Sequence, residues 1–243
     1  MLDATFAPPM SFFHTLPVPC PYIDGLMERR LIADLDSRRG RLNHDALARA
    51  GFRRTQTLIY RPACPTCNAC KPVRTQIARF KPNRAFARCI AANLDLVPAW
   101  RPTQATEEQY ELFNRYQSGR HTGGEMGLMD FADYADMVER TPIDSALIEY
   151  RDADQRLMAV ILVDRQDDGL SAVYSFFDPD LPRRGLGTFM VLDLIAQAAA
   201  AGLPYLYLGY WIAGSRKMSY KTRFQPCEFL VDGKWIPAKD LPD

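Results

Sequence analysis

The stretch from residue 185 to residue 224 constrains the fold of this chain more than any other. Gly185 and Gly187 open an apolar run up to Ala201, with the length and composition of a helix. A strand over residues 203–210 is predicted next, and its aromatic end leads directly into a group of cations. Aromatic residues followed at once by cations indicate a site for an extended, partly anionic ligand.

The elements predicted upstream complete a recognisable order. Thr106 and Gln109 fit a capping box at the start of a helix, and a second helix is expected over residues 131–140. Three strands follow, over residues 146–150, 157–164 and 172–177. With the later helix and strand, this order resembles the core of a GNAT-type acyltransferase and predicts an α+β fold. In such a core the first backbone N–H groups of the later helix bind phosphate or an acyl carbonyl, and they belong here to Leu186, Gly187 and Thr188.

The charge distribution separates an N-terminal region from this core. Residues 53–101 contain ten Lys or Arg and one acid, whereas residues 105–180 contain six Arg and seventeen acids, although the formal net charge is only +1. We expect a smaller, basic N-terminal α+β domain over residues 1–100 and the GNAT-like domain over residues 101–243, joined by a Pro-rich linker at 98–102. The basic stretch is either a solvated face or a surface for a polynucleotide.

Three cysteines in this N-terminal domain are spaced by two residues each. Cys64, Cys67 and Cys70 can converge on one metal, and Cys20 can supply a fourth ligand from the N-terminal segment. Zinc or an iron–sulfur cluster would suit four sulfurs. The alternatives are reduced thiols that pack a small core, or a redox sensor. The remaining two, Cys89 and Cys227, are expected to be ordinary buried residues.

The composition indicates a folded, soluble protein. Hydrophobic residues make up 47% of the chain, which is enough for a large core. No run approaches the roughly 18 apolar residues of a membrane span, and the N-terminus lacks a charged start before a long apolar segment. We therefore expect no membrane partner and a cytoplasmic location.

Several sequence blocks resemble one known family, the arginyl-tRNA–protein transferases, and within it the bacterial aspartate/glutamate leucyltransferases. The two most specific blocks are the cysteine loop, from Tyr60-Arg61-Pro62 to Pro72-Val73-Arg74, and residues 205–221, which hold Tyr210-Trp211-Ile212 and Lys217-Met218-Ser219-Tyr220-Lys221. The similarity spans roughly residues 14–230. The other matching blocks are Cys20-Pro21-Tyr22, Glu28-Arg29, Gly51-Phe52-Arg53-Arg54, Arg120-His121, Leu186-Gly187-Thr188, Phe224 and Pro226.

The resemblance implies an enzyme that moves leucine from leucyl-tRNA to the α-amino group of proteins with N-terminal Asp or Glu, which creates an N-degron for protein degradation. Arginyl-tRNA is the alternative donor. An acetyl-CoA-dependent N-acetyltransferase is a further alternative, which Pro182 disfavours because the usual signature has Arg or Gln there. A non-catalytic module that binds tRNA or zinc is the third alternative. Transfer from an activated ester requires no cofactor.

The candidate site residues follow from this chemistry, which needs a neutral amine, two positioned substrates and a stabilised oxyanion. His121, Lys217 and Tyr210 are the catalytic candidates, with Glu125 as a weaker base than His121. Binding of the acceptor carboxylate and of the donor requires cations, aromatic side chains and backbone N–H groups. The alternative role of the aromatic residues is core packing, and that of the cations is a solvated face. The substrate-binding candidates are Arg120, Leu186, Gly187, Thr188, Tyr207, Trp211, Arg216 and Lys221, and the tRNA-binding candidates are Arg53, Arg54, Arg61, Lys71 and Arg74.

Overall fold

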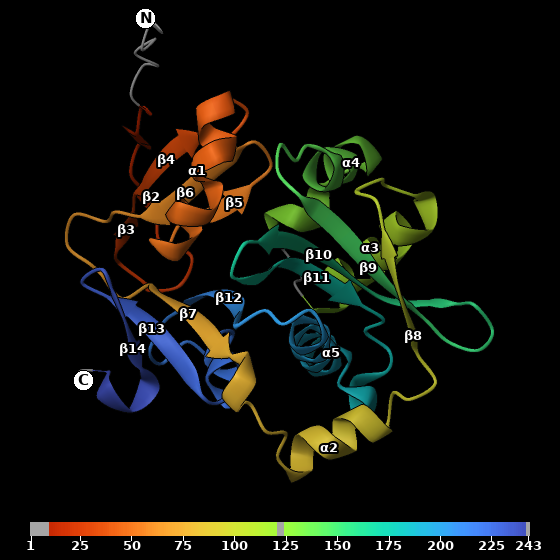
Figure 1. The fold of residues 1–243 in the computed structure, drawn as a ribbon. Coiled ribbons are helices and arrows are strands. Elements are labelled where there is room, and N and C mark those ends of the chain that lie inside the picture. The colour runs from red at the N-terminus through yellow and green to blue at the C-terminus, as the bar shows by residue number, and fades with distance from the viewer. Residues whose placement is uncertain (1–9, 121–123, 242–243) are drawn as a thin grey trace, which may run out of the picture.

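The computed structural model describes residues 10–120 and 124–241, and a large mixed sheet dominates it (Figure 1). Within the described residues this sheet has eight strands, most of them antiparallel. In chain order they are β7 (Lys71–Gln76), β8 (Val97–Arg101), β9 (Ser145–Arg151), β10 (Leu157–Gln166), β11 (Gly169–Phe177), β12 (Tyr205–Trp211), β13 (Cys227–Val231) and β14 (Lys234–Pro237), and their order in the sheet is β14-β13-β7-β12-β11-β10-β9-β8.

Helices cover both faces of this sheet, which explains the long apolar run of β10. Val160 and Leu162 of β10 pack under α3 (Glu107–Arg120) and α4 (Phe131–Glu139). The alternate residues Ile161 and Val163 point to the other face, toward α5 (Leu186–Ala200) and α2 (Arg84–Ala91). Because successive side chains of a strand point to opposite faces, a strand covered on both sides becomes hydrophobic throughout.

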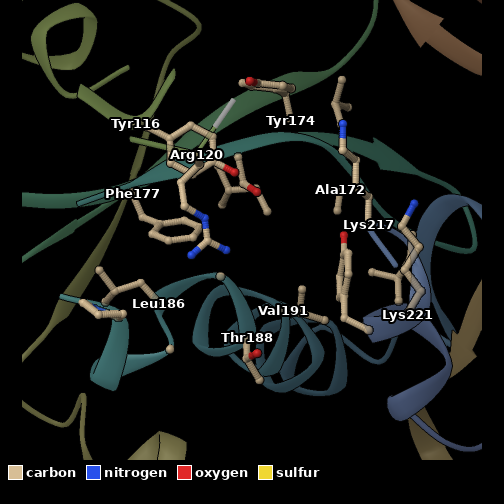
Figure 2. A pocket seen from close by; sticks show the side chains of 18 of the residues that line it. Tyr116, Arg120, Ala172, Tyr174, Phe177, Leu186, Thr188, Val191, Lys217 and Lys221 are labelled. Atoms are coloured by element: carbon tan, nitrogen blue, oxygen red, sulfur yellow. The ribbon is translucent and has the colours of Figure 1, made fainter. Parts of the chain in front are cut away.

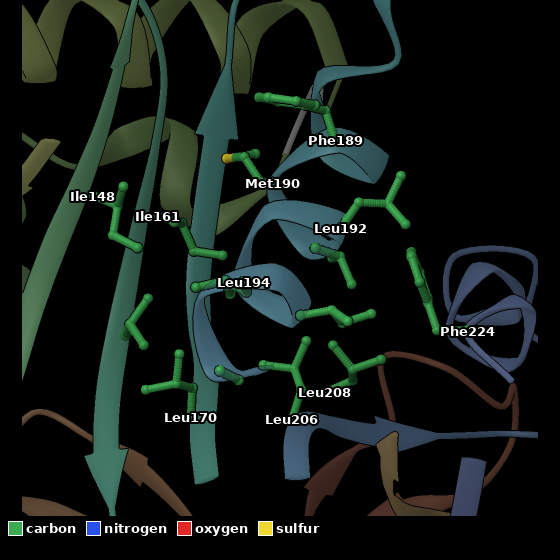
Figure 3. Close-up of a cluster of buried hydrophobic side chains, with 14 of the residues drawn as sticks. Ile148, Ile161, Leu170, Phe189, Met190, Leu192, Leu194, Leu206, Leu208 and Phe224 are labelled. Atoms are coloured by element: carbon green, nitrogen blue, oxygen red, sulfur yellow. The ribbon is translucent and has the colours of Figure 1, made fainter. Parts of the chain in front are cut away.

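Helix α5 forms the centre of the larger core (Figure 3). Met190 and Leu194 are fully buried, and Leu192 packs on the side toward Phe224. A helix that is apolar on nearly all sides must be enclosed on nearly all sides, here by the sheet, α2 and the segment after β12. The predicted helix over residues 185–201 is thereby confirmed.

Strands β11 and β12 are parallel neighbours that pair over only a short distance. Their register joins Gly169–Ser171 with Tyr205–Tyr207, and no further pairs continue it within the described residues. Beyond this point the two strands separate, and α5 connects them across the gap (Figure 1). A β-bulge in β12 follows between Tyr207 and Gly209, and the φ of 80° at Gly209 favours glycine. The separation leaves an opening in the middle of the sheet.

The N-terminal region forms a smaller layer beside the large sheet. Helix α1 (Arg38–Arg49) covers a four-stranded sheet in the order β1-β4-β6-β5, with Leu35, Phe52 and Ile59 in the core. The remaining short elements are β1 (Phe13–His14), β2 (Val18–Pro19), β3 (Met27–Glu28), β4 (Arg30–Asp34), β5 (Arg53–Thr55), β6 (Leu58–Pro62) and the 3-10 turns η1 (Ile77–Arg79), η2 (Glu125–Leu128), η3 (Pro182–Arg184), η4 (Ser219–Arg223) and η5 (Ala238–Asp240).

Three sequence-based expectations about this region need correction. Residues 98–102 do not form a linker, because β8 pairs with β9 as the edge strand of the large sheet, a position that tolerates Pro98. Since β7 and β8 both belong to that sheet, a domain boundary at residue 100 does not match the strand pairing. From the sequence, Asn43 and Gly51 would bound a short helix over residues 45–50, but α1 begins earlier, because Ser37 caps it. No helix in the described part of the chain is long and apolar enough to cross a membrane.

Candidate active site

The opening between β11 and β12 is a cleft of about 620 Å³ (Figure 2). Its base is the N-terminal half of α5, and its walls come from α3, β11, β12 and the segment after β12. Aliphatic side chains of β10, β11, β12, α5 and the segment before α5 form part of its lining. The aliphatic residues that line it are Ile161, Ala172, Val173, Leu181, Leu186, Val191 and Leu208.

The cleft is strongly cationic. Five positively charged side chains line it, whereas none of its lining residues within the described chain is an acid. None of the five forms an ion pair with a described carboxylate. Such a site favours an anionic ligand, because the charges have no internal partner. The five are Arg53, Arg120, Arg216, Lys217 and Lys221.

Arg53 reaches the cleft from the N-terminal layer. It belongs to β5, and its Nη2 donates a hydrogen bond to the carbonyl oxygen of Ala172 at 2.7 Å. The guanidinium lies against Gly209, where an added Cβ would sit 2.6 Å from Arg53 Nη1. Glycine is therefore required at residue 209 both for its backbone conformation and for the passage of Arg53.

Lys221 closes the same end of the cleft from η4. Its Nζ donates a hydrogen bond to the carbonyl oxygen of Tyr210 at 2.6 Å. Burial, reinforced by the nearby charge of Arg53, lowers the pKa of Lys221 to about 7. Lys217 and Arg216 precede it and are exposed at the mouth of the cleft.

Arg120 marks the opposite end (Figure 2). It ends α3, and its guanidinium carbon lies 5.5 Å from the centre of the Phe177 ring. Tyr174 stands on β11 and accepts a 2.6 Å hydrogen bond from Gln117 Nε2, while burial raises its pKa to about 12. Tyr116 also lines this end. The cleft thus has two cationic ends separated by an apolar middle.

The start of α5 also lines the cleft, through Gly185, Leu186, Gly187 and Thr188. Gly185 has a φ of 64°, and its carbonyl oxygen accepts the N–H groups of Thr188 and Phe189. The N–H groups of Leu186 and Gly187 have no acceptor among the described residues. Gly187 itself leaves room for Phe177, because an added Cβ would lie 2.9 Å from that ring. Two backbone donors are therefore free at the helix end that lines the cleft.

Three predicted aromatic residues do not line the cleft, and their assignment is corrected. Tyr207 is buried on the other side of β12, where its hydroxyl donates to Asp168 at 2.8 Å. Trp211 packs against Phe229, with ring centres 5.0 Å apart. The Tyr210 hydroxyl donates to the carbonyl oxygen of Gly51 at 2.8 Å. Their side chains pack or hydrogen-bond outside the cleft, and Tyr210 meets the site through the carbonyl that holds Lys221.

Two predicted tRNA-binding arginines are also reassigned. Arg54 is buried and donates to both oxygens of Asp164, at 2.7 Å from Nη2 and 2.9 Å from Nε. Arg74 is buried against Glu228, with an Nε–Oε2 distance of 2.8 Å. Neither guanidinium is available to a phosphate. Arg61, which packs over the Phe52 ring, is exposed, and Lys71 is half-buried.

The four predicted metal ligands share a second, much smaller cavity of about 60 Å³. Cys20, Cys64, Cys67 and Cys70 line it together with Tyr210 and other residues. Burial and the neighbouring thiols raise the pKa of Cys70 to about 12. Within residues 10–120 and 124–241, no three His, Cys, Asp or Glu residues are arranged to hold a metal ion. The metal site stays a prediction.

Sequence reasoning missed three tyrosines of the cleft. Tyr116 lies one helical turn before Arg120, a spacing that could have placed it on the same face. Tyr220 stands between the two predicted lysines, and Tyr174 lies in a correctly predicted strand. His121, the predicted base, lies outside the described residues.

Comparison with known proteins decides the family. The family model "Arginine-tRNA-protein transferase, N terminus" matches residues 18–88, and "Arginine-tRNA-protein transferase, C terminus" matches residues 108–231. The chain belongs to the arginine-tRNA-protein transferase family. Both ends of the cleft lie within the C-terminal match, since Arg120 and Lys221 fall inside it. Arg53 falls within the N-terminal match.

Similar members of the arginine-tRNA-protein transferase family have a more specific name. A protein of Gluconacetobacter diazotrophicus is 50% identical over 94% of this chain and 88% of its own length, and one of Paramagnetospirillum magneticum is 52% identical over 93% of each. Both are called aspartate/glutamate leucyltransferase. Among solved structures, L-PGS from Bacillus licheniformis aligns with a TM-score of 0.50 at 12% identity, over 76% of this chain and 61% of that one, which shows a shared fold.

Proposed function

We propose that this chain transfers leucine from leucyl-tRNA to the α-amino group of proteins that begin with Asp or Glu. The observation that carries the proposal is the cleft, which combines five cations with an apolar middle and has no acid among its described lining residues. Relatives of about half-identical sequence bear the corresponding name. The separated β11 and β12, bridged by α5, support a GNAT-like acyltransferase core.

The donor amino acid occupies the apolar middle of the cleft. Ile161, Val191 and Leu208 offer an aliphatic surface that suits a leucyl side chain. An arginyl side chain would bring a guanidinium into a site that already holds five cations. Its charge would find no carboxylate among the described lining residues, and an unpaired buried charge is costly. The cleft therefore favours leucine over arginine.

The acceptor binds at the end that holds Lys217. Its side-chain carboxylate pairs with Lys217 and Arg216, the two cations exposed at the mouth. A neutral N-terminal residue would leave these cations without a partner after desolvation, which explains selection for Asp and Glu.

The 3′ end of the tRNA enters from the opposite end. Arg120 faces its terminal phosphate, while the N–H groups of Leu186 and Gly187 stabilise the oxyanion that forms at the ester carbonyl. Tyr174 and Tyr116 provide ring surfaces beside Arg120 on which the terminal adenine stacks.

The tRNA stem follows exposed cations outside the cleft. Helix α2 carries no acid, and its arginines are exposed. Arg223 joins this surface to η4, because its guanidinium carbon lies 5.3 Å from the Phe86 ring of α2. Arg61 and Lys71 remain candidate phosphate contacts on the N-terminal layer. We define the α2 surface as Lys81, Arg84, Arg88, Arg183 and Arg223.

The reaction is the aminolysis of an activated ester. The acceptor nitrogen attacks the leucyl carbonyl carbon, and the bond to the terminal ribose oxygen breaks. This chemistry requires positioning, a neutral amine and charge stabilisation, and it needs no cofactor. The product carries an N-terminal leucine, which marks the acceptor for degradation in the cytoplasm.

One assay tests donor, acceptor and reaction together. Purified protein is incubated with radiolabelled leucyl-tRNA, arginyl-tRNA or acetyl-CoA, and with peptides that begin with Asp, Glu, Asn, Gln or Ala. We expect label from leucyl-tRNA to enter the Asp and Glu peptides alone. Transfer of arginine would overturn the donor assignment, and equal transfer to Asn and Gln peptides would overturn the role of the cationic mouth. Label from acetyl-CoA would replace the proposed reaction class.

A further inference from the structure

Lys221 differs from three other cations of the cleft in its surroundings. Arg120, Arg216 and Lys217 are exposed, whereas Lys221 is partly buried and its Nζ is fixed to the Tyr210 carbonyl oxygen. Of the described residues, no acid shares the cleft with it. The charged and titratable groups at this end are Arg53 from β5, Tyr210 from β12, Arg216 and Lys217 from the preceding loop, and Tyr220 from η4; Tyr116 and Arg120 of α3 line the opposite end.

This arrangement opposes a second positive charge and permits a neutral amine. A partly buried ammonium beside Arg53 has no carboxylate partner among the described residues; its contacts are the Tyr210 carbonyl oxygen and, at 5.9 Å from the ring centre, the face of Tyr220. A neutral amine loses little there, because it still donates one hydrogen to that carbonyl and keeps its lone pair free. The lone pair is the feature that a base requires.

We propose that Lys221 is the general base that takes a proton from the α-ammonium group of the acceptor. The inference rests on the proposed leucyl transfer. It also explains the position of Lys217, because Lys217 lies at the same end of the cleft and would hold the acceptor's carboxylate beside its α-amino group.

Two protons leave the acceptor nitrogen in the proposed step. The ammonium gives one proton to Lys221, and the neutral amine attacks the ester carbonyl to form the C–N bond. When the tetrahedral intermediate collapses, the C–O bond to the terminal ribose breaks. The second proton lost by the nitrogen passes to the leaving oxygen, which becomes a hydroxyl. Lys221 then releases its proton to solvent and returns to the neutral form.

The titration of Lys221 suits this role. Its pKa of about 7 lies just below that of an α-amino group, about 7.7–8.0. Below pH 7 Lys221 is protonated and cannot accept a proton, so transfer should rise as the pH increases through 7. The folded-state pKa lies below the ordinary value of 10.5. Burial of Lys221 therefore costs stability fully below pH 7, and the cost fades as the pH approaches the ordinary value.

Two substitutions separate a base from a simple positive charge. Lys221→Arg keeps a cation that does not lose its proton near neutral pH, and Lys221→Ala removes the amine. At saturating leucyl-tRNA and Asp-peptide, we expect both to lower transfer by about 10²- to 10⁴-fold. Small primary amines should restore peptide leucylation by Lys221→Ala, more effectively as their pKa rises, but not by Lys221→Arg. Lys239→Ala, an exposed lysine outside the cleft, is the matched control.

Several results would overturn the inference. Near-normal transfer by Lys221→Arg would show that charge alone is needed. Absence of amine rescue in a folded Lys221→Ala protein that still binds tRNA would assign Lys221 to positioning. If Lys221→Ala does not fold, an unchanged pH dependence in Lys221→Arg would exclude the base role. Wild-type protein that transfers no leucine would refute the proposed function itself, whereas active wild-type protein with active variants refutes only this inference.

Discussion

Arg53 and Arg54 are neighbours on β5, yet they serve opposite regions of the molecule. The Arg54 side chain is 1% exposed and pairs with Asp164, which is 2% exposed. Arg53 turns to the cleft, where its hydrogen-bond acceptor among the described residues is the carbonyl oxygen of Ala172. The same contrast separates Arg74, paired with Glu228, from Lys221. A cation with an internal carboxylate holds the fold together, whereas a cation held without one is positioned for an external anion.

The largest expected effect, on stability, comes from breaking a buried ion pair. Asp164→Ala leaves the Arg54 guanidinium buried without its carboxylate, and it also removes the acceptor of a 2.7 Å hydrogen bond from Ser145. We expect the free energy of unfolding to fall by about 3–5 kcal/mol, measured by urea denaturation.

The matched control is an ion pair on the surface. Asp136 and Arg140 on α4 are 49% and 58% exposed, so Asp136→Ala should cost no more than about 0.5 kcal/mol. If the two substitutions cost the same, the buried pair does not hold the N-terminal layer to the sheet.

The contrast between Arg53 and Arg54 also shows where sequence reasoning ends. Both lie in one basic stretch, and their partners are distant: Asp164 follows Arg54 by 110 residues. Local signals were sufficient for the helix beginning near Thr106, because its capping box is made by adjacent residues. Edge strand β8 and the partners of Tyr207 depend on contacts across the chain, which spacing does not reveal.

For the candidate site, too, local patterns could be predicted from the sequence and distant contacts could not. The start of α5 was predicted because a Gly-containing turn before an apolar run is a local pattern, and the cations after β12 were predicted from their clustering. The sequence did not reveal which face of β12 opens on the cleft. Tyr207 and Leu208 are neighbours, and only Leu208 lines it. A shift of one residue exchanges the two faces of a strand.

A smaller effect, on transfer activity, is expected from removing a cation of the cleft that no described acid pairs with. Lys217→Ala removes an exposed cation that pairs with no acid in the described part of the chain, so the stability should not change. Loss of its charged contact with the acceptor carboxylate, about 1.5–3 kcal/mol, should lower kcat/KM for an Asp-peptide by roughly 10- to 150-fold. Transfer to an Asn-peptide should change much less, so the Asp/Asn preference falls.

Competition assays with both peptides measure this preference directly. Lys239→Ala serves again as the control, because it removes an exposed lysine of equal charge outside the cleft. A uniform loss for both peptides would mean that Lys217 acts on the donor or on the chemical step, and not on the acceptor's carboxylate.

The smallest effect is expected outside the cleft, on the α2 surface. Arg84→Ala with Arg88→Ala removes two exposed arginines that no described acid pairs with. If both contact tRNA phosphates, the affinity for leucyl-tRNA should fall several-fold, and the slope of log affinity against log salt should decrease by roughly 0.7–0.9 per lost contact. Filter binding at several salt concentrations measures both quantities.

The matched control is a double variant that loses the same charge at two arginines that lie near acids. Arg140 and Arg156 are similarly exposed, and each lies near an aspartate. If Arg140→Ala with Arg156→Ala lowers tRNA affinity and its salt slope as much as the α2 variant does, net charge alone governs binding. If only the α2 variant does so, the rule drawn from Arg53 and Arg54 extends to the surface, because cations without an internal acid are the ones that meet the RNA.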